Sequence, residues 1–265
     1  MTKDKQPVCL SIAGLDPSGG AGVIADVKTF GAFGCYATAA VTAVTFQNTT
    51  GVFGAEHETA GSVRRQIEAV LDDFDVLAIK TGMLPTVEII EVVAGLIQDR
   101  QIENVVVDPV VRSTSGYDLI DRSALRALTA SLFPLATLVT PNIPEAELIT
   151  GIAIDSNEDI CDAAEIIRGM GAKNVLMKGG HLSNAEAGKA AVDRLFIGEE
   201  LHEFSAEYID TTATHGTGCV LSAAIAANLA LGQTLTEAVA LAKEFVTHAI
   251  RTAPKIGHGN SPINV

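Results

Sequence analysis

A glycine-rich segment close to the carboxyl end of the chain has the composition of an anion-binding loop. Its residues are Thr214-His215-Gly216-Thr217-Gly218-Cys219, and a predicted helix rich in small residues follows from 220 to 231. A glycine turn that leads into a helix exposes backbone N–H groups beside the positive end of the helix dipole, which suits an anion. Cys219 falls in the first helical turn, where a thiolate is stabilised and the pKa of the thiol can be lowered. A structural loop with an inert buried cysteine fits the local pattern equally well.

Charged and amide side chains lie at the carboxyl ends of three predicted strands. Asp108 ends the run N-V-V-V-D, Lys178 precedes a Gly-Gly pair, and Asn142 and Glu145 follow a third strand. Oxygens for a hard cation and one ammonium for phosphate are what a nucleotide–Mg²⁺ site needs. The separation of three between Asn142 and Glu145 is also that of a helix N-cap with Glu at N3, and spacing alone favours this capping pair.

A second glycine-rich segment, residues 14–22, follows the first predicted strand. Its sequence G-L-D-P-S-G-G-A-G lacks the Lys and Ser/Thr that complete a P-loop, and it does not match G-x-G-x-x-G. Its glycines still permit close approach to a ligand, although a tight connection is equally supported. Gln47 can donate and accept at the edge of a heteroaromatic ring, and Met83 can pack on such a ring or in the core. His215 suits a base or, at least as well, a residue that positions its loop.

Alternating strands and helices are predicted to bring these residues together. The predicted strands are 8–13, 36–46 (one strand or a pair), 76–80, 104–108, 137–140 and 174–178, with a hairpin at 190–197 and 201–208. The predicted helices are 21–33, 62–71, 87–99, 123–132, 144–150, 160–170, 218–231 and 235–252. This order predicts an α/β fold with a mostly parallel sheet covered on both faces. Ligands bind such sheets at the carboxyl ends of the strands. No linker interrupts the order, so we expect one domain over residues 1–265.

Composition excludes several classes of partner. The chain carries 18 basic and 32 acidic residues, a formal net charge of −14, which argues against a nucleic-acid binder because polyphosphate requires a basic face. Its longest apolar stretch, 219–231, is shorter than the roughly 20 residues a bilayer requires, and no secretory signal is evident. Four cysteines without zinc-like spacing indicate free thiols in a reducing compartment. We therefore expect a cytoplasmic protein without a membrane partner.

Together these segments resemble the hydroxymethylpyrimidine/phosphomethylpyrimidine kinases of the ribokinase superfamily. The resemblance extends from Val8 to Asn264 and rests on residues 14–22, Gln47, 81–84, 108–110, 141–145, 215–219 and the terminal G-x-G-x-x-P-x-N. It implies a three-layer α/β ribokinase-like fold, a homodimer, and ATP with Mg²⁺. The implied reaction phosphorylates 4-amino-5-hydroxymethyl-2-methylpyrimidine and then its monophosphate.

The same resemblance implies a role for individual residues. Gln47 contacts the aminopyrimidine edge, and the other implied substrate-binding residues are Gly14, Asp26, Met83 and Val110. The implied nucleotide-binding residues are Asp108, Asn142, Lys178 and His215, and the implied Mg²⁺ ligands are Glu145, Asn142 and Asp108. The implied catalytic group comprises Gly216, Thr217, Gly218 and Cys219. Sugar kinases of the superfamily carry a catalytic Asp where this chain has Cys219.

Three alternatives remain at the level of sequence. A pyridoxal kinase would use the same fold for another hydroxymethyl-bearing ring, although Gln47 and Met83 favour the aminopyrimidine. A nicotinamide-dependent oxidoreductase needs G-x-G-x-x-G after the first strand, which residues 14–22 do not supply. A non-catalytic pyrimidine-binding protein is opposed by the presence of Asn142, Glu145, Lys178 and Cys219.

Overall fold

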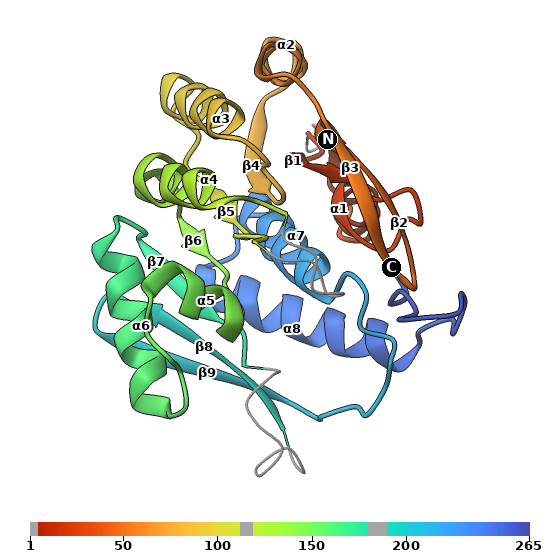
Figure 1. The fold of residues 1–265 in the computed structure, drawn as a ribbon, viewed down its shortest axis with the longest axis vertical. Coiled ribbons are helices and arrows are strands. Elements are labelled where there is room, and N and C mark those ends of the chain that lie inside the picture. The colour runs from red at the N-terminus through yellow and green to blue at the C-terminus, as the bar shows by residue number, and fades with distance from the viewer. Residues whose placement is uncertain (1–4, 112–118, 180–189) are drawn as a thin grey trace.

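One nine-stranded sheet runs through the part of the chain that the computed structural model describes, residues 5–111, 119–179 and 190–265. Its strands are β1 Val8–Leu15, β2 Tyr36–Asn48, β3 Gly51–His57, β4 Val76–Thr81, β5 Val105–Val107, β6 Leu138–Val139, β7 Asn174–Met177, β8 Ala191–Ile197 and β9 Glu200–Ala206. Their order across the sheet is β3-β2-β1-β4-β5-β6-β7-β8-β9 (Figure 1). The pairs from β2 through β7 are parallel, whereas β3, β8 and β9 pair antiparallel at the two edges.

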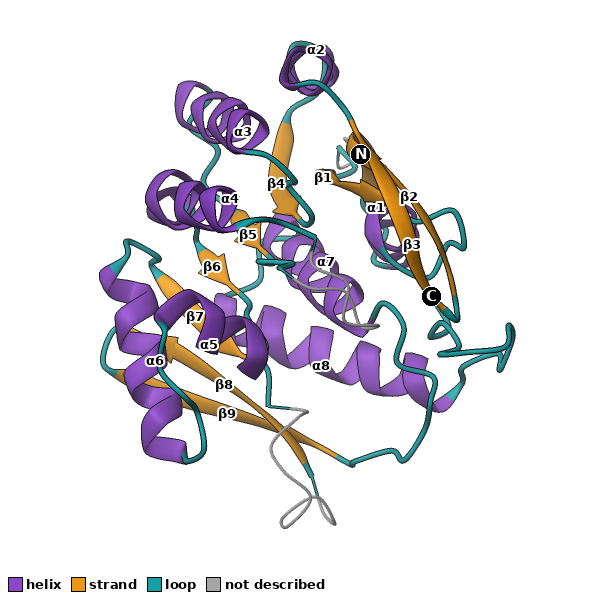
Figure 2. Ribbon diagram, viewed as in Figure 1, coloured by secondary structure: helices purple, strands orange, loops and turns teal. Residues whose placement is uncertain are grey.

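Helices cover both faces of the sheet. They are α1 Gly22–Ala32, α2 Ala60–Leu71, α3 Val87–Asp99, α4 Arg122–Ala127, α5 Ile143–Thr150, α6 Asn157–Gly169, α7 Thr217–Ala230 and α8 Leu235–Arg251. Helices α2 through α6 pack on one face of the sheet and share an apolar core with it. Helices α1, α7 and α8 share a second apolar core with the opposite face (Figure 2). The predicted three-layer α/β fold, with a mostly parallel sheet, is therefore confirmed.

Burial explains the sequences of the central elements. The three valines of β5 are fully buried because helices pack on both faces of that strand. Helix α7 is buried from Val220 to Ala230, and its small side chains let it lie between the sheet and α8. This packing fixes the amino-terminal end of α7 at the carboxyl ends of the parallel strands.

Two predicted elements differ from the structure. The segment predicted as 36–46 extends to Asn48, and a strand that the sequence did not suggest, β3, pairs with it from Gly51 to His57. The helix predicted over 123–132 is α-helical only from Arg122 to Ala127 and continues as a π-helical turn over Leu128–Leu132. Pro134 lies in the short 3₁₀ turn that follows, Phe133–Leu135.

In the residues that the structure describes, no helix combines the length and the apolar character needed to cross a membrane.

Candidate active site

Two glycine-rich loops lie against each other at the carboxyl ends of the parallel strands. Gly216, the N-cap of α7, has φ +85°, and a Cβ there would overlap the carbonyl oxygen of Gly20 in the β1–α1 loop. A Cβ on Gly20 would in turn lie 2.9 Å from Nε2 of His215. Backbone therefore packs on backbone at this contact, and the absence of side chains keeps the start of α7 beside the start of α1.

Asp16 holds the two loops together. Its carboxylate is fully buried and accepts hydrogen bonds from Ser18 N (2.8 Å), Ser18 Oγ (2.7 Å) and Ala21 N (2.9 Å). His215 Nε2 lies 2.8 Å from Asp16 Oδ2. Burial alone would raise the pKa of Asp16, but the bonds with His215 and Ser18 outweigh it and hold that pKa below its ordinary value. His215 thus has the loop-positioning role that the sequence left open, and its predicted contact with the nucleotide stays a prediction.

Cys219 lies in the first turn of α7, beside the start of α1, but its pKa does not follow the expectation from sequence. Burial of the thiol is the largest influence, and the carboxylates of Asp26 and Asp108 act in the same direction. The ammonium of Lys80 and the N–H of Gly22 oppose them without compensating, and the pKa of Cys219 is raised to about 11. The lowering that a position in the first helical turn allows is not found here, because burial and the two carboxylates outweigh the Lys80 ammonium and the Gly22 N–H.

A buried ion pair beside Cys219 was not identified from the sequence. Lys80, in β4, places Nζ 2.8 Å from both carboxylate oxygens of Asp26 in α1, and both residues have zero exposure. Ser11 Oγ donates to Asp26 Oδ2 at 2.5 Å. Burial alone would lower the pKa of Lys80, but Asp26, Cys219 and Asp108 raise it above its ordinary value, so the ammonium stays charged. A lysine in the otherwise apolar run V-L-A-I-K-T was the available signal.

This pairing changes the interpretation of Asp26. Burial raises the pKa of its carboxyl above the ordinary value, although Lys80 and Ser11 lower it. Because its oxygens already accept bonds from Lys80 and Ser11, the carboxylate supports the ammonium that faces Cys219. The substrate contact predicted for Asp26 stays a prediction.

A second charged cluster lies around Lys178, directly after β7. Its Nζ donates to Asp108 Oδ1 at 2.9 Å and lies 3.8 Å from Glu145 Oε2. Asp108 also accepts from Thr140 Oγ1 at 3.1 Å and from Ser222 Oγ, in α7, at 3.3 Å. Burial would raise the pKa of Asp108, but the ammonium groups hold it below its ordinary value. The ionised Asp108–Lys178 pair is thus tied to the same helix that begins at the glycine loop.

Gly218 brings the glycine-rich loop at the start of α7 to this cluster. A Cβ on Gly218 would lie 3.3 Å from Lys178 Nζ and 3.7 Å from Asp108 Oδ2. The start of α7, one ammonium and one carboxylate therefore converge within a few ångströms. Thr217, the first residue of α7, contributes its backbone to the same turn. The predicted juxtaposition of Gly218, Lys178 and Asp108 is observed, whereas their roles toward a ligand stay predictions.

Asn142 and Glu145 form the capping pair that spacing favoured. Asn142 Oδ1 accepts from Glu145 N at 2.8 Å, and Glu145 Oε2 accepts from Asn142 N at 2.9 Å. Burial raises the pKa of Glu145 to about 7, with Lys178 opposing and Asp108 reinforcing the shift. Glu145 therefore caps the amino-terminal end of α5 and also faces Lys178.

The residues proposed for Mg²⁺ suit a cation that arrives with phosphate. Within the described ranges, no group of three or more His, Cys, Asp and Glu side chains is gathered as a metal site. Mg²⁺ in nucleotide sites typically takes one or two carboxylates, waters and the phosphates themselves. Asp108 and Glu145, both facing Lys178, fit that partial set of ligands.

Residues predicted to contact the ring lie at the ends of β1, β2 and β4. A Cβ on Gly14 would lie 3.2 Å from Met83 Sδ, and Thr42 Oγ1 in β2 donates to the Met83 carbonyl at 2.6 Å. Gln47 is half-buried near the end of β2. Val110, also half-buried, donates its N–H to the Asp108 carbonyl at 2.8 Å and so lies next to the charged cluster. The structure thus brings Gly14 and Met83 into contact and adds Thr42 to them.

The model of the phosphomethylpyrimidine kinase family matches residues 16–264, nearly the whole chain. The chain belongs to this family. Among members of the phosphomethylpyrimidine kinase family, the hydroxymethylpyrimidine/phosphomethylpyrimidine kinase of Haemophilus influenzae is 44% identical over 96% of this chain and 95% of its own length.

Two further proteins are similar to this chain over nearly its whole length. The thiamine biosynthesis bifunctional protein ThiED of Geobacter sulfurreducens is 46% identical over 96% of this chain, which spans about half (51%) of that longer protein. A pyridoxal kinase of Bacillus subtilis, solved as an ADP complex, superposes with a TM-score of 0.88 at 37% identity, covering 98% of this chain and 97% of that one. The resemblance inferred from the motifs is confirmed at the level of family and fold.

Proposed function

We propose that this chain transfers the γ-phosphoryl group of ATP to 4-amino-5-hydroxymethyl-2-methylpyrimidine, and then phosphorylates the monophosphate to the pyrophosphate. The observation that carries the proposal is the convergence of Lys178 and Asp108 on Gly218 at the start of α7, with Gly14 and Met83 at neighbouring strand ends. Membership of the phosphomethylpyrimidine kinase family supports the choice of substrate.

Phosphoryl transfer depends mainly on positioning and on stabilising the charge of the phosphoryl oxygens. In the proposed enzyme, backbone N–H groups from Gly216 to Cys219 and the Lys178 ammonium hold the transferred group. Asp108 and Glu145, with Asn142 beside them, would hold Mg²⁺ that arrives with the nucleotide, and this ion would neutralise phosphate charge. Gln47, Gly14, Met83 and Val110 hold the ring.

Cys219 is proposed to hold the hydroxymethyl oxygen of the substrate and to take its proton. With a pKa of about 11 the thiol is mostly protonated at neutral pH, so only a minor thiolate form accepts the proton. This small thiolate fraction is sufficient when the transition state of phosphoryl transfer is loose, because the attacking hydroxyl then loses its proton late. The Lys80 ammonium, held by Asp26, stabilises the thiolate as it forms.

Phosphorus NMR of the purified protein with Mg-ATP and the hydroxymethylpyrimidine tests the function directly. We expect a monophosphate resonance first and a diphosphate product signal afterwards, in step with loss of the ATP γ-signal. A reaction that stops at the monophosphate would contradict the second step. ATP that stays intact in the presence of the pyrimidine would contradict the proposal as a whole.

Pyridoxal kinase activity is the second candidate, and one comparison favours it. The Bacillus subtilis pyridoxal kinase shares 37% of its sequence with this chain at a TM-score of 0.88. We propose weak phosphorylation of pyridoxine beside the main activity. Parallel coupled assays with the two substrates test which activity is the main one. A kcat/KM for pyridoxine equal to that for the pyrimidine would reverse this ranking.

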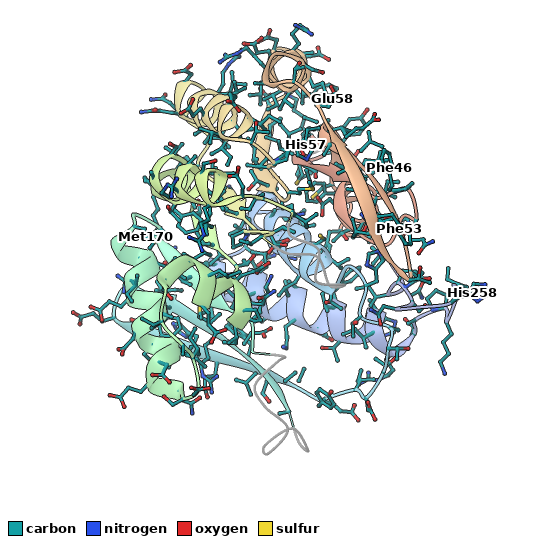
Figure 3. The ribbon with its side chains drawn as sticks, viewed as in Figure 1. Phe46, Phe53, His57, Glu58, Met170 and His258 are labelled. Carbon is teal, nitrogen blue, oxygen red and sulfur yellow. The ribbon has the colours of Figure 1, made fainter. Side chains whose placement is uncertain are left out.

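We further propose a single-domain, cytoplasmic protein that forms a homodimer through β2 and β3. One continuous sheet supports the single domain. Phe46 on β2 and Phe53 on the edge strand β3 are 47% and 69% exposed (Figure 3). Val44, also on β2, is 37% exposed. Apolar side chains exposed on an edge strand and on the strand beside it are typical of a surface that a partner covers.

Sedimentation at micromolar concentration tests the dimer. We expect a species of twice the 27.5 kDa chain mass, and a monomer for Phe53→Glu, because a charge in an apolar interface is costly. Leu77→Glu, which adds a charge at a residue that is 46% exposed in β4, serves as the control and should stay dimeric. A wild-type monomer would contradict the proposal.

A further inference from the structure

A chain of hydrogen bonds connects the glycine-rich segment 14–22 to Gln47. Thr45 Oγ1 lies 2.9 Å from the carbonyl oxygen of Leu15, at the end of β1. Gln47 Nε2 lies 2.7 Å from the same Thr45 oxygen. Thr45 is 3% exposed, so water has little access to its hydroxyl. The three groups therefore form one ordered chain along the end of β2.

The donor and acceptor of each hydrogen bond follow from the number of hydrogens that each group carries. A threonine hydroxyl has a single hydrogen, and the Leu15 carbonyl can only accept. Thr45 must therefore donate to Leu15 and can only accept from Gln47. Since only the NH₂ of the Gln47 amide can donate, Nε2 faces Thr45. The Oε1 atom, which forms no hydrogen bond among the described residues, and the second N–H are then left for a ligand.

The backbone around Gln47 keeps the amide near the ring-binding residues. The pairing of β2 with β3 shifts between Phe46 and Gln47, so that Gln47 pairs with Val52 after Phe46 has paired with Gly54. At the same end of the sheet, Leu15 follows Gly14, whose Cα faces Met83. The Thr45 bond thus acts on the one side chain of β2 that the sequence predicted to contact the ring.

We propose that Thr45 is a positioning residue that fixes the orientation of the Gln47 amide and thereby selects a ring edge carrying an exocyclic amino group. The inference rests on the proposed function. An exocyclic amino group donates, and the adjacent ring nitrogen accepts, so this edge needs the Gln47 carbonyl and one of its N–H groups. A ring that carries an oxygen and a protonated nitrogen in the same places presents an acceptor and a donor in the opposite order. Such a ring matches the Gln47 amide only after the amide group rotates by 180°.

Two pyrimidines that differ only at this edge provide the test. The probes are 4-amino-5-hydroxymethyl-2-methylpyrimidine and its 4-oxo analogue, with calorimetric binding to the protein in the absence of nucleotide and turnover with Mg-ATP measured in parallel. The variants are Thr45→Val, which removes the acceptor, and Thr45→Ser, which keeps it. Thr38→Val is the matched control, because Thr38 Oγ1 also donates from β2 to a β1 carbonyl, that of Cys9, at 2.9 Å.

We expect wild type to bind the amino compound more tightly, and Thr45→Val to reduce the ratio of the two affinities about tenfold, the effect of one oriented hydrogen bond. Thr45→Ser should restore the ratio to within about threefold of wild type, and Thr38→Val should leave it unchanged. A merely structural role for Thr45 would weaken both ligands equally, and a ratio unchanged in Thr45→Val, or shifted alike by Thr38→Val, overturns the inference.

Failure of the proposed function gives a different result. If wild type binds the amino compound but turns over neither pyrimidine, the kinase proposal fails while the binding ratio still decides the role of Thr45. If wild type binds neither pyrimidine, both proposals are overturned.

Discussion

Gly216→Ala is expected to reduce kcat/KM about 100-fold or more and to lower the melting temperature by about 5 to 15 °C. The residue has φ +85°, which costs a residue with a side chain about 1–2 kcal/mol. A Cβ would also overlap the carbonyl oxygen of Gly20, and the backbone shift that relieves this overlap costs about 1–3 kcal/mol more. The shift moves the start of α7 away from Lys178, so the groups that hold the phosphoryl group are displaced.

Gly232→Ala separates the two contributions. Gly232 follows α7 with φ +84°, but a Cβ there would meet no atom within 4 Å. This variant should be less stable than wild type only by the cost of a left-handed backbone, about 1–2 kcal/mol, and should keep wild-type turnover. Thermal denaturation and steady-state kinetics of both proteins provide the comparison. Equal losses of stability and activity in both variants would show that the contact between the two loops is unimportant.

Cys219→Ser should reduce kcat about 100-fold or more while leaving the affinity for ATP within about twofold of wild type. A serine hydroxyl is a far weaker acid than a thiol, so the ionised form that accepts the substrate proton becomes inaccessible. The N–H groups that hold phosphate belong to the backbone and are unaffected. Single-turnover kinetics and equilibrium nucleotide binding measure the two effects separately, and undiminished kcat in this variant would remove Cys219 from the mechanism.

The raised pKa of Cys219 predicts how its reactivity depends on pH. Because only the thiolate reacts with iodoacetamide, the alkylation rate should rise about tenfold per pH unit from pH 7 and level off only near 11. The experiment uses a Cys161→Ala background, since Cys161 is exposed, whereas Cys9 and Cys35 are buried. A plateau below pH 9 would mean that Lys80 and the helix N-terminus outweigh burial.

Local pattern accounts for most of the elements. Helices α3, α6 and α8 were predictable because apolar side chains recur with helical spacing and Thr or Ser caps their starts. Strand β3 was not predictable, because G-V-F-G-A-E-H has no strict alternation and two glycines. It forms because β2 offers a free edge across a short turn. The π-helical turn after α4 likewise depends on its packing against α3.

The sequence by itself determined the order of strands and helices along the chain, and it supplied the candidate residues that follow the strand ends. Gly14, Gln47, Asp108, Asn142, Lys178 and Cys219 could be selected because residue type and strand-end position are local properties. Motif content over nearly the whole chain also determined the family.

Only the tertiary structure decided how those groups behave. Asp16 and His215 are 199 residues apart, yet they hold the two glycine loops together. The Lys80–Asp26 pair and the direction of the Cys219 pKa likewise depend on partners from different strands and helices. The orientation of the Gln47 amide depends on Leu15 in β1, whose carbonyl takes the only hydrogen of the Thr45 hydroxyl. Burial and the direction of a hydrogen bond are set by every group within a few ångströms, and sequence spacing does not report which groups those are.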